Sequence, residues 1–293
     1  MSGARRWRSL FFAPANRLDL VRKFPRWAAD VSVMDLEDGT PDAQKEAARH
    51  VAEQAAREVR PALKGQLYLR VNQPESRHFA EDLLLAAGLP VDGVVVPKVE
   101  RPDQLLFAQD LLAARRPPGQ GPLSIIVGIE SAWGVERASQ LAGAAPVAVA
   151  VYFGAEDYAA DLGAERTAAG TEVLYARSRV ALAARLAALA GLDQAVTEIR
   201  DDQRFRDDAQ VGRQLGYRGK ICVHPRQVAL AHEAFAPSEV AVAWSRRLLA
   251  QYETAAASGR GTIEFEGQMV DGPLLSRARQ VLAAAGAEEG GGQ

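Results

Sequence analysis

Short apolar stretches alternate with longer segments of helical period along most of this 293-residue chain. Eight such stretches are rich in β-branched and aliphatic residues, and most are apolar on both faces, as expected of parallel strands covered on both sides. Eight consecutive strand-then-helix units predict a closed (β/α)8 TIM barrel, a fold in which a chain of this length forms one domain. The stretches are Ser9–Ala13, Val31–Leu36, Leu67–Val71, Gly93–Pro97, Ser124–Glu130, Ala148–Gly154, Ala195–Ile199 and Lys220–Val223.

An open, doubly wound sheet is the alternative fold for the same alternation. No glycine-rich phosphate-binding fingerprint follows any of the predicted strands, which argues against it. After the eighth strand, residues 227–257 have helical composition, residues 258–267 resemble a linker, and residues 273–285 favour a final short helix. The glycine-rich residues 286–293 are typical of a disordered tail. We therefore expect a barrel domain over residues 1–257, followed by a C-terminal linker and helical lid over residues 258–293.

Charge and composition exclude several classes of function. The formal net charge is −2, and the basic residues do not gather into one stretch, so affinity for nucleic acid or for anionic membranes is not expected. No apolar run approaches the roughly 20 residues that span a bilayer. The single cysteine, Cys222, excludes an internal disulfide. A cytoplasmic protein is predicted.

Polar residues follow the predicted strands at their carboxyl ends. In a (β/α)8 barrel these ends share one rim, and active sites are built there. The sequence therefore places a ring of acids, bases and amides at one face of the barrel. The ring consists of Asp35, Glu37, Asp38, Arg70, Asn72, Lys98, Glu100, Glu130, Ser131, Glu156, Asp157 and His224.

Glu130 and Asp157 lie about one β/α repeat apart, at the ends of neighbouring predicted strands. Such strands are roughly 4.8 Å apart, so two carboxylates there repel each other unless a cation lies between them. Mg²⁺ suits such a pair because it takes oxygen ligands and keeps several positions for water and substrate. Zinc is disfavoured, since no His or Cys accompanies the pair. Alternatively, either acid caps the following helix or pairs with an arginine.

Five further residues are interpreted from their positions. Arg70 can hold a carboxylate or a developing oxyanion through two parallel hydrogen bonds, or can form a salt bridge with Glu37 or Glu130. The position of Lys98 favours a structural role, in which it pairs with Glu37 or Glu100. Asp35, Glu37 and Asp38 are predicted to include partners that orient Arg70 or a metal-bound water.

Asp271 lies far from this ring in the sequence, within Met269–Val270–Asp271–Gly272–Pro273. Taken by itself, it has the position of a helix N-cap.

These residues occur in short motifs that run in order over nearly the whole chain. Through them the chain resembles the citrate lyase beta-subunit-like family, within the HpcH/HpaI aldolase group that includes malyl-CoA and citramalyl-CoA lyases. The motifs are Arg8–Ser9–Leu10–Phe11 with Pro14 and Asn16, Asp35–Leu36–Glu37–Asp38 with Lys45 and Arg49, Arg70–Val71–Asn72, Pro97–Lys98–Val99–Glu100, Ile129–Glu130–Ser131–Ala132, Phe153–Gly154–Ala155–Glu156–Asp157, Gly219–Lys220 with His224–Pro225, and Val270–Asp271–Gly272–Pro273.

The resemblance implies a role for each of the central residues. It implies Mg²⁺ on Glu130 and Asp157, with substrate oxygens held by Arg70 and contacted by Glu130. Asp271 matches an aspartate that, in the stand-alone lyases, reaches into a neighbouring subunit's site, so the resemblance replaces the N-cap interpretation with a catalytic one. A homotrimer or a dimer of trimers is also implied.

The activity implied by the resemblance is magnesium-dependent carbon–carbon cleavage, or formation, of a 3-hydroxyacyl thioester such as malyl-CoA, citramalyl-CoA or citryl-CoA. The products would be a small 2-oxo acid and an acyl thioester of CoA or of an acyl carrier. Three alternatives stay open: a citryl-acyl-carrier lyase beta subunit that needs partner subunits, a thioester hydrolase or malate-synthase-like enzyme, and a non-catalytic protein that binds CoA or a keto acid.

Overall fold

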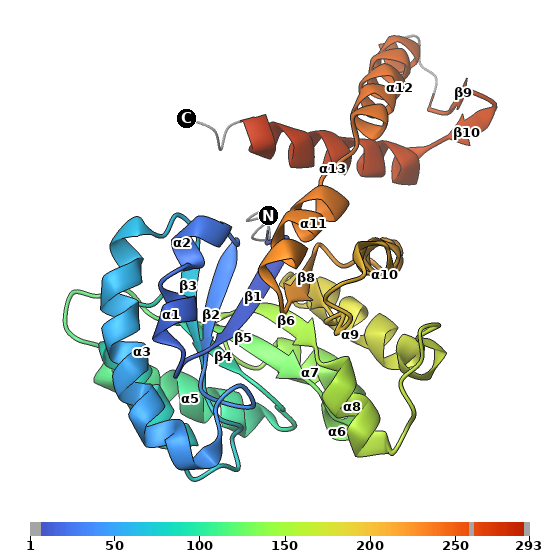
Figure 1. Cartoon of the computed structure of the whole chain (residues 1–293). Coiled ribbons are helices and arrows are strands. Elements are labelled where there is room, and N and C mark those ends of the chain that lie inside the picture. Colours follow the sequence, from blue (N-terminus) through green and yellow to red (C-terminus); the bar gives the residue numbers. More distant parts are fainter. Residues whose placement is uncertain (1–6, 258–260, 290–293) are drawn as a thin grey trace. The chain divides into compact units, whose positions relative to one another are not determined.

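Eight parallel strands close into a barrel in the order β1 to β8 in the computed structural model, which describes residues 7–257 and 261–289. β1 pairs with both β2 and β8, so the barrel has no free edge (Figure 1). The predicted (β/α)8 fold is confirmed. The strands are β1 (Ser9–Pro14), β2 (Val31–Asp35), β3 (Gln66–Arg70), β4 (Gly93–Val96), β5 (Ser124–Ile129), β6 (Ala148–Phe153), β7 (Ala190–Asp193) and β8 (Gly219–Cys222).

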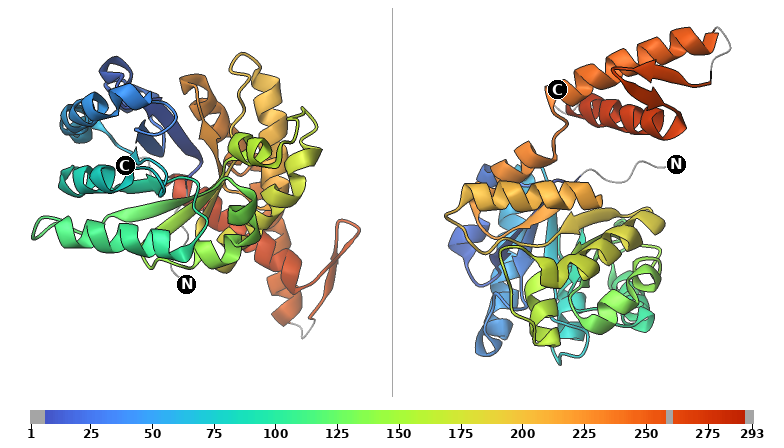
Figure 2. Two further views of the ribbon diagram at one scale, coloured as in Figure 1. Left: turned by 90° about the horizontal axis from the view of Figure 1, so that it is seen from below. Right: turned by 90° about the vertical axis from the view of Figure 1, so that its right-hand side faces the viewer.

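Helices connect successive strands and lie around the outside of the barrel (Figure 2). They are α1 (Leu18–Val21), α2 (Phe24–Trp27), η1 (Asp42–Gln44), α3 (Lys45–Val59), η2 (Arg60–Ala62), α4 (Phe79–Gly88), α5 (Pro102–Arg115), α6 (Ala132–Glu136), α7 (Ala138–Ala142), α8 (Ala155–Leu162), η3 (Thr171–Val173), α9 (Leu174–Leu186), α10 (Asp202–Leu215) and α11 (Pro225–Phe235). α3 shows why they pack there: it buries Ala48, Ala52, Ala55 and Ala56, which recur on one face of a 3.6-residue helix.

Side chains that alternate along the strands fill the inside of the barrel. The buried cluster includes Leu10 from β1, Val33 from β2, Tyr68 from β3, Ile126 from β5 and Tyr152 from β6. This alternation follows from the two-residue period of a strand. The barrel is therefore a packed core, and chemistry is confined to its rims.

The seventh strand differs from its prediction. It runs from Ala190 to Asp193, whereas Ala195–Ile199 was expected and lies in a loop. Leu192 pairs with Tyr152 of β6 and packs inside the barrel, while Ile199 is exposed. The glycine and aspartate in this short strand hid it from a search for apolar, β-branched residues.

The C-terminal residues form a unit of their own. It contains α12 (Glu239–Ala257), the antiparallel strands β9 (Ile263–Phe265) and β10 (Gln268–Val270), and α13 (Gly272–Glu289). Glu266 and Gly267 join the two strands with φ values of 50° and 77°, as a two-residue hairpin turn requires. Leu248, Phe265, Val270, Leu275 and Ala278 make a separate small core.

The division of the chain also differs from the expected one. The described residues up to Ala234 form one compact unit and those from Phe235 onward form a second, whereas a boundary after residue 257 was expected. The reason is that Leu248 of α12 belongs to the core of the C-terminal unit. The expected linker 258–267 contains β9, and Gly286, expected in the disordered tail, lies in α13; residues 290–293 are outside the described residues. Among described residues, no helix is both long and apolar enough to cross a membrane.

Candidate active site

Asp35 and Arg70 end two neighbouring strands and meet at the carboxyl rim. They are register partners on β2 and β3. Arg70 donates through Nε to Asp35 Oδ1 and through Nη2 to Asp35 Oδ2, each at 2.7 Å, in the paired geometry that guanidinium and carboxylate favour. Burial raises the pKa of the Asp35 carboxyl. The charge and hydrogen bonds of Arg70 lower this pKa by more than burial raises it, so it lies below its ordinary value. Asp35 is therefore an anion that fixes the plane of Arg70.

Two further contacts enclose Arg70. Its Nη1 lies 3.1 Å from Glu37 Oε2, and its Cζ lies 4.8 Å from the centre of the Phe12 ring. Phe12 lies on β1 and also meets Tyr152 edge-on, with 6.4 Å between ring centres. The predicted salt bridge between Arg70 and Glu37 is thus present. Asp35, Glu37 and Phe12 contact the guanidinium on three sides.

Lys98 gathers three carboxylates. Its Nζ lies 2.6 Å from Glu37 Oε1, 3.0 Å from Asp38 Oδ2 and 3.2 Å from Asp157 Oδ1. The expected contact with Glu37 is present, whereas Glu100 accepts a hydrogen bond from Ser131 Oγ. Burial lowers the pKa of Lys98, but its acidic partners raise it well above its ordinary value. Lys98 therefore remains a cation between strands β2, β4 and β6.

Glu130 follows β5 and is almost completely buried, with 2% of its surface exposed. Its Oε1 accepts hydrogen bonds from the Tyr152 hydroxyl and from the backbone N–H of Lys98, the latter at 3.0 Å. Burial, and then the negative charge of Glu37, raise the pKa of Glu130 to about 8. A buried acid whose pKa is raised this far is typical of a functional site that binds a further charged group.

Two glycines make room for the Glu130 carboxylate. A Cβ added at Gly154 would lie 2.5 Å from Glu130 Oε2, and one added at Gly128 would lie 2.6 Å from Oε1. Both distances are shorter than real Cβ contacts, so the carboxylate would have to move. The position of Glu130 therefore depends on the absence of side chains at Gly128 of β5 and at Gly154, which follows β6.

Asp157 lies in the first turn of α8, a helix that the sequence did not predict. A negative charge is favourable there because backbone N–H groups point toward the helix start. Asp157 has 38% of its side chain exposed, whereas Glu130 is buried. Lys98 contacts both residues, which places the two predicted metal ligands at the same part of the rim.

The residues present fit a magnesium ion. The part of the chain that the structure describes contains no cluster of three or more His, Cys, Asp or Glu side chains able to hold a metal. Mg²⁺ is commonly held by one or two carboxylates and keeps several waters, so the Glu130 and Asp157 oxygens are an adequate donor set. Among the described residues, the hydrogen bonds to Glu130 are accepted by Oε1, and Gly154 places no side chain against Oε2.

Two residues, Tyr152 and Lys45, have roles in this site that the sequence did not predict, although Lys45 belongs to one of the family motifs. Tyr152 donates to Glu130 from within an apolar strand, where nothing distinguishes it from a core aromatic. Lys45, at the start of α3, is buried and donates to the carbonyl oxygens of Leu36 and Glu37 at 2.8 and 3.0 Å, and to Asn72 Oδ1. Lys45 therefore holds the backbone of the acidic turn after β2.

Two other rim residues, His224 and Asn72, contact the segments that follow their strands. The His224 N–H donates to Gln227 Oε1 at 3.3 Å, and His224 Nδ1 accepts from the backbone N–H of Arg226. Asn72 donates to Asp82 Oδ2 at 2.6 Å. These contacts join strand ends to the helices that follow, which is a structural role.

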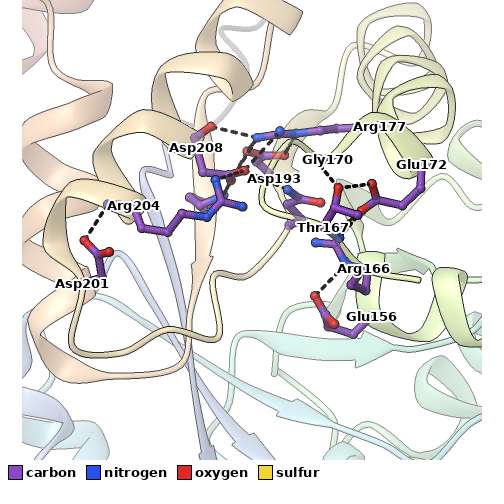
Figure 3. A network of polar contacts seen from close by, with 12 residues as sticks. Glu156, Arg166, Thr167, Gly170, Glu172, Arg177, Asp193, Asp201, Arg204 and Asp208 are labelled. Atoms are coloured by element: carbon purple, nitrogen blue, oxygen red, sulfur yellow. Dashed lines mark hydrogen bonds and ion pairs between the residues drawn. The ribbon is translucent and has the colours of Figure 1, made fainter. Parts of the chain in front are cut away.

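A second charged cluster lies behind β7 and β8, away from the rim. Arg177 of α9 contacts both oxygens of Asp193 (Figure 3). Lys220 of β8 lies between Asp193 and Asp208. All four side chains are buried. Two acids and two bases balance one another here, so the cluster fastens α9 and α10 to the barrel.

Asp271 belongs to the C-terminal unit, between β10 and α13. Its carbonyl oxygen accepts the N–H of Leu275 at 3.2 Å, so the residue leads directly into the helix. Its predicted catalytic role stays a prediction.

Comparison with known proteins identifies a family. The family model described as HpcH/HpaI aldolase/citrate lyase matches residues 8–225. A citrate lyase subunit beta-like protein of Deinococcus radiodurans is 48% identical over 279 residues, which cover 94% of this chain and 96% of that protein. The citrate lyase subunit beta of Escherichia coli is 38% identical over 165 residues, which cover 56% of this chain and 55% of that protein.

A solved structure resembles the whole chain. It is the protein CitE from Mycobacterium tuberculosis in complex with magnesium, acetoacetate and coenzyme A. It is 32% identical, has a TM-score of 0.79, and the match covers 97% of this chain and 99% of that one.

Proposed function

The chain belongs to the HpcH/HpaI aldolase/citrate lyase family, a family of magnesium-dependent oxo-acid lyases, and from this premise we propose that it cleaves a 3-hydroxyacyl thioester into a 2-oxo acid and an acyl thioester. The observation that supports this most is the acidic pair Glu130 and Asp157. Lys98 contacts both acids, and nearby Arg70 is held in place by Asp35. Magnesium complexes of M. tuberculosis CitE agree with a cation at such a pair.

Glu130 and Asp157 would hold Mg²⁺, with Glu130 using the oxygen that Tyr152 and Lys98 leave open. When bound, the ion would supply Lewis-acid polarisation of the substrate's carboxylate and hydroxyl oxygens. Arg70 would hold the substrate carboxylate, because its plane is fixed by Asp35 and needs no reorganisation during the reaction. Arg70 then stabilises the charge that develops on the product oxygens.

The cleavage balances as a retro-Claisen reaction. The substrate hydroxyl gives its proton to solvent water, the carbon–carbon bond breaks, and its electron pair passes to the thioester as an enolate. The former hydroxyl carbon becomes the carbonyl of the 2-oxo acid. We assign Asp271, supplied by the C-terminal segment of a neighbouring copy in a homotrimer or a dimer of trimers, to protonate the enolate carbon and to remove that proton in the condensation direction. The C-terminal unit would then serve as the lid.

The substrate test is a cleavage assay on the purified full chain. Malyl-CoA, methylmalyl-CoA, citramalyl-CoA and citryl-CoA are compared in parallel, with and without EDTA, following both the released 2-oxo acid and free CoA. We expect EDTA-sensitive release of a 2-oxo acid from at least one of these thioesters. Release of free CoA without an acyl thioester would indicate a hydrolase instead. No cleavage of any thioester, with magnesium still bound, would favour a partner-dependent beta subunit or a binding protein.

A further inference from the structure

Lys98 contacts both proposed magnesium ligands with two different groups. Its backbone N–H donates to Glu130 Oε1 at 3.0 Å, and its Nζ lies 3.2 Å from Asp157 Oδ1. Glu130 comes from the end of β5 and Asp157 from the first turn of α8, so a single residue after β4 spans the pair. A lysine that only supported the fold would not need to contact both acids.

The backbone of Lys98 has an unusual conformation that makes this double contact. Its φ is +50°, in the left-handed region that residues with a side chain rarely adopt. Such conformations persist where the surroundings hold them, and they are concentrated at functional sites. At Lys98 this conformation accompanies an amide contact with the buried acid Glu130 and an ammonium contact with the partly exposed acid Asp157.

The rim carries more negative than positive charge. Asp35, Glu37, Asp38, Glu130 and Asp157 are joined to the two cations Arg70 and Lys98 by the contacts described above. Arg70 is held by Asp35 and Glu37, so Lys98 is the cation placed against Asp157. A divalent cation on Asp157 would meet the Lys98 charge a few ångströms away, and like charges at that distance repel.

We propose that Lys98 is a built-in counter-cation for the magnesium site: its ammonium holds Asp157 while no metal is bound, and yields that oxygen to Mg²⁺ while keeping Glu37 and Asp38. Under the proposed function, which this inference presupposes, Lys98 therefore weakens the affinity for magnesium and keeps the acidic rim assembled without it. A purely supporting lysine would have the opposite effect, since its loss would disorder the ligands and weaken metal binding.

The test replaces Lys98 by methionine, which keeps the length of the side chain and removes its charge. Magnesium binding is measured by isothermal titration calorimetry on the full chain, and thermal unfolding is measured in EDTA and in saturating magnesium. We expect Lys98→Met to bind magnesium roughly tenfold more tightly. This is the order of magnitude of the repulsion in water between a single and a double positive charge about 5 Å apart. We also expect it to melt at a lower temperature than the native chain in EDTA, and to gain more from magnesium.

Two controls separate local charge from other effects. Lys98→Arg keeps the charge and should stay close to native affinity. Lys64→Met removes one charge from an exposed position in the segment before β3 and should leave affinity unchanged. Unchanged or weaker magnesium binding in folded Lys98→Met overturns the proposal. Because the readouts are binding and melting, failure of the native chain to cleave thioesters is a separate result that would count only against the proposed function.

Discussion

The guanidinium of Arg70 lies edge-on against the carboxylate of Asp35, with two nitrogen–oxygen distances of 2.7 Å. A lysine cannot reproduce this, because its ammonium is a single rotatable point of charge. The orientation of Arg70 is therefore part of the site before any substrate arrives. This relationship gives a first prediction for the reaction.

Arg70→Lys should lower kcat/KM for thioester cleavage by roughly 100-fold or more, the usual cost of removing a preorganised oxyanion donor. Steady-state kinetics measure this, and circular dichroism verifies folding. The control is Arg22→Lys, which alters an arginine paired with Glu58 by two nitrogen–oxygen contacts at the exposed surface. Equal activity of Arg70→Lys and the native chain would remove Arg70 from substrate binding.

Gly154→Ala should weaken magnesium binding by about tenfold or more. The backbone at Gly154, with φ −93° and ψ 87°, does not require glycine, so the effect comes from the new Cβ, placed 2.5 Å from Glu130 Oε2. Calorimetric titration measures the affinity. Gly143→Ala is the matched control, since the nearest atom to its Cβ lies at 3.8 Å. Native affinity in Gly154→Ala would show that Glu130 Oε2 is not needed for the metal.

Asp208→Asn should lower the free energy of unfolding by about 3 kcal/mol at pH 7, because it leaves the buried cations Lys220 and Arg177 short of one partner. Burial raises the pKa of Asp208, but Lys220 and Arg177 lower it more, so the folded pKa is below the ordinary 3.8. The stabilisation is thus present above about pH 4 and is lost as the pH falls through the folded value.

Urea unfolding at pH 7 and at several values below pH 4 checks this prediction. The difference between Asp208→Asn and the native chain should shrink toward low pH. Asp207→Asn is the control, since the carboxylate of Asp207, next to Asp208 in the chain, is exposed and accepts a hydrogen bond from Gln203 Nε2. A difference that stays constant with pH would mean that the charge of Asp208 is not the source of its effect.

Asp271→Asn should abolish turnover while leaving magnesium affinity unchanged, because the proposed role of Asp271 is proton transfer and not metal binding. Kinetics and calorimetry on the same preparation give both values. Glu264→Gln, an exposed acid on β9 of the same unit, should behave as the native chain does. Full activity of Asp271→Asn would exclude that residue from the mechanism.

Much of the fold was predictable because burial on both faces leaves a clear record in parallel strands. The rim acids were predictable as well, since Asp35 and Glu130 directly end or follow apolar strands. The predicted position of β7 was wrong because its Ala-Gly-Leu-Asp sequence lacks β-branched residues. β9 and β10 were missed because three residues are too few to show a period.

Residues that act through others were the hardest to find. Tyr152 is an aromatic residue in an apolar strand, and only its hydroxyl contact with Glu130 reveals a role. Lys45 lies at the start of a helix, where a lysine is ordinarily solvated, yet it is buried against the turn after β2. Asp157 was assigned to the correct rim but to a strand end instead of a helix start. Such contacts depend on packing between distant segments, which a pattern along the chain does not record.

The most direct test measures magnesium binding and thioester cleavage together in Glu130→Gln and Asp157→Asn. Both variants keep the shape of the side chain and remove one charge. If these two carboxylates hold the cation that cleavage requires, magnesium affinity and 2-oxo acid release will fall together in each variant, and excess magnesium will restore part of the activity. Cleavage at the native rate in a variant that no longer binds magnesium would contradict the account.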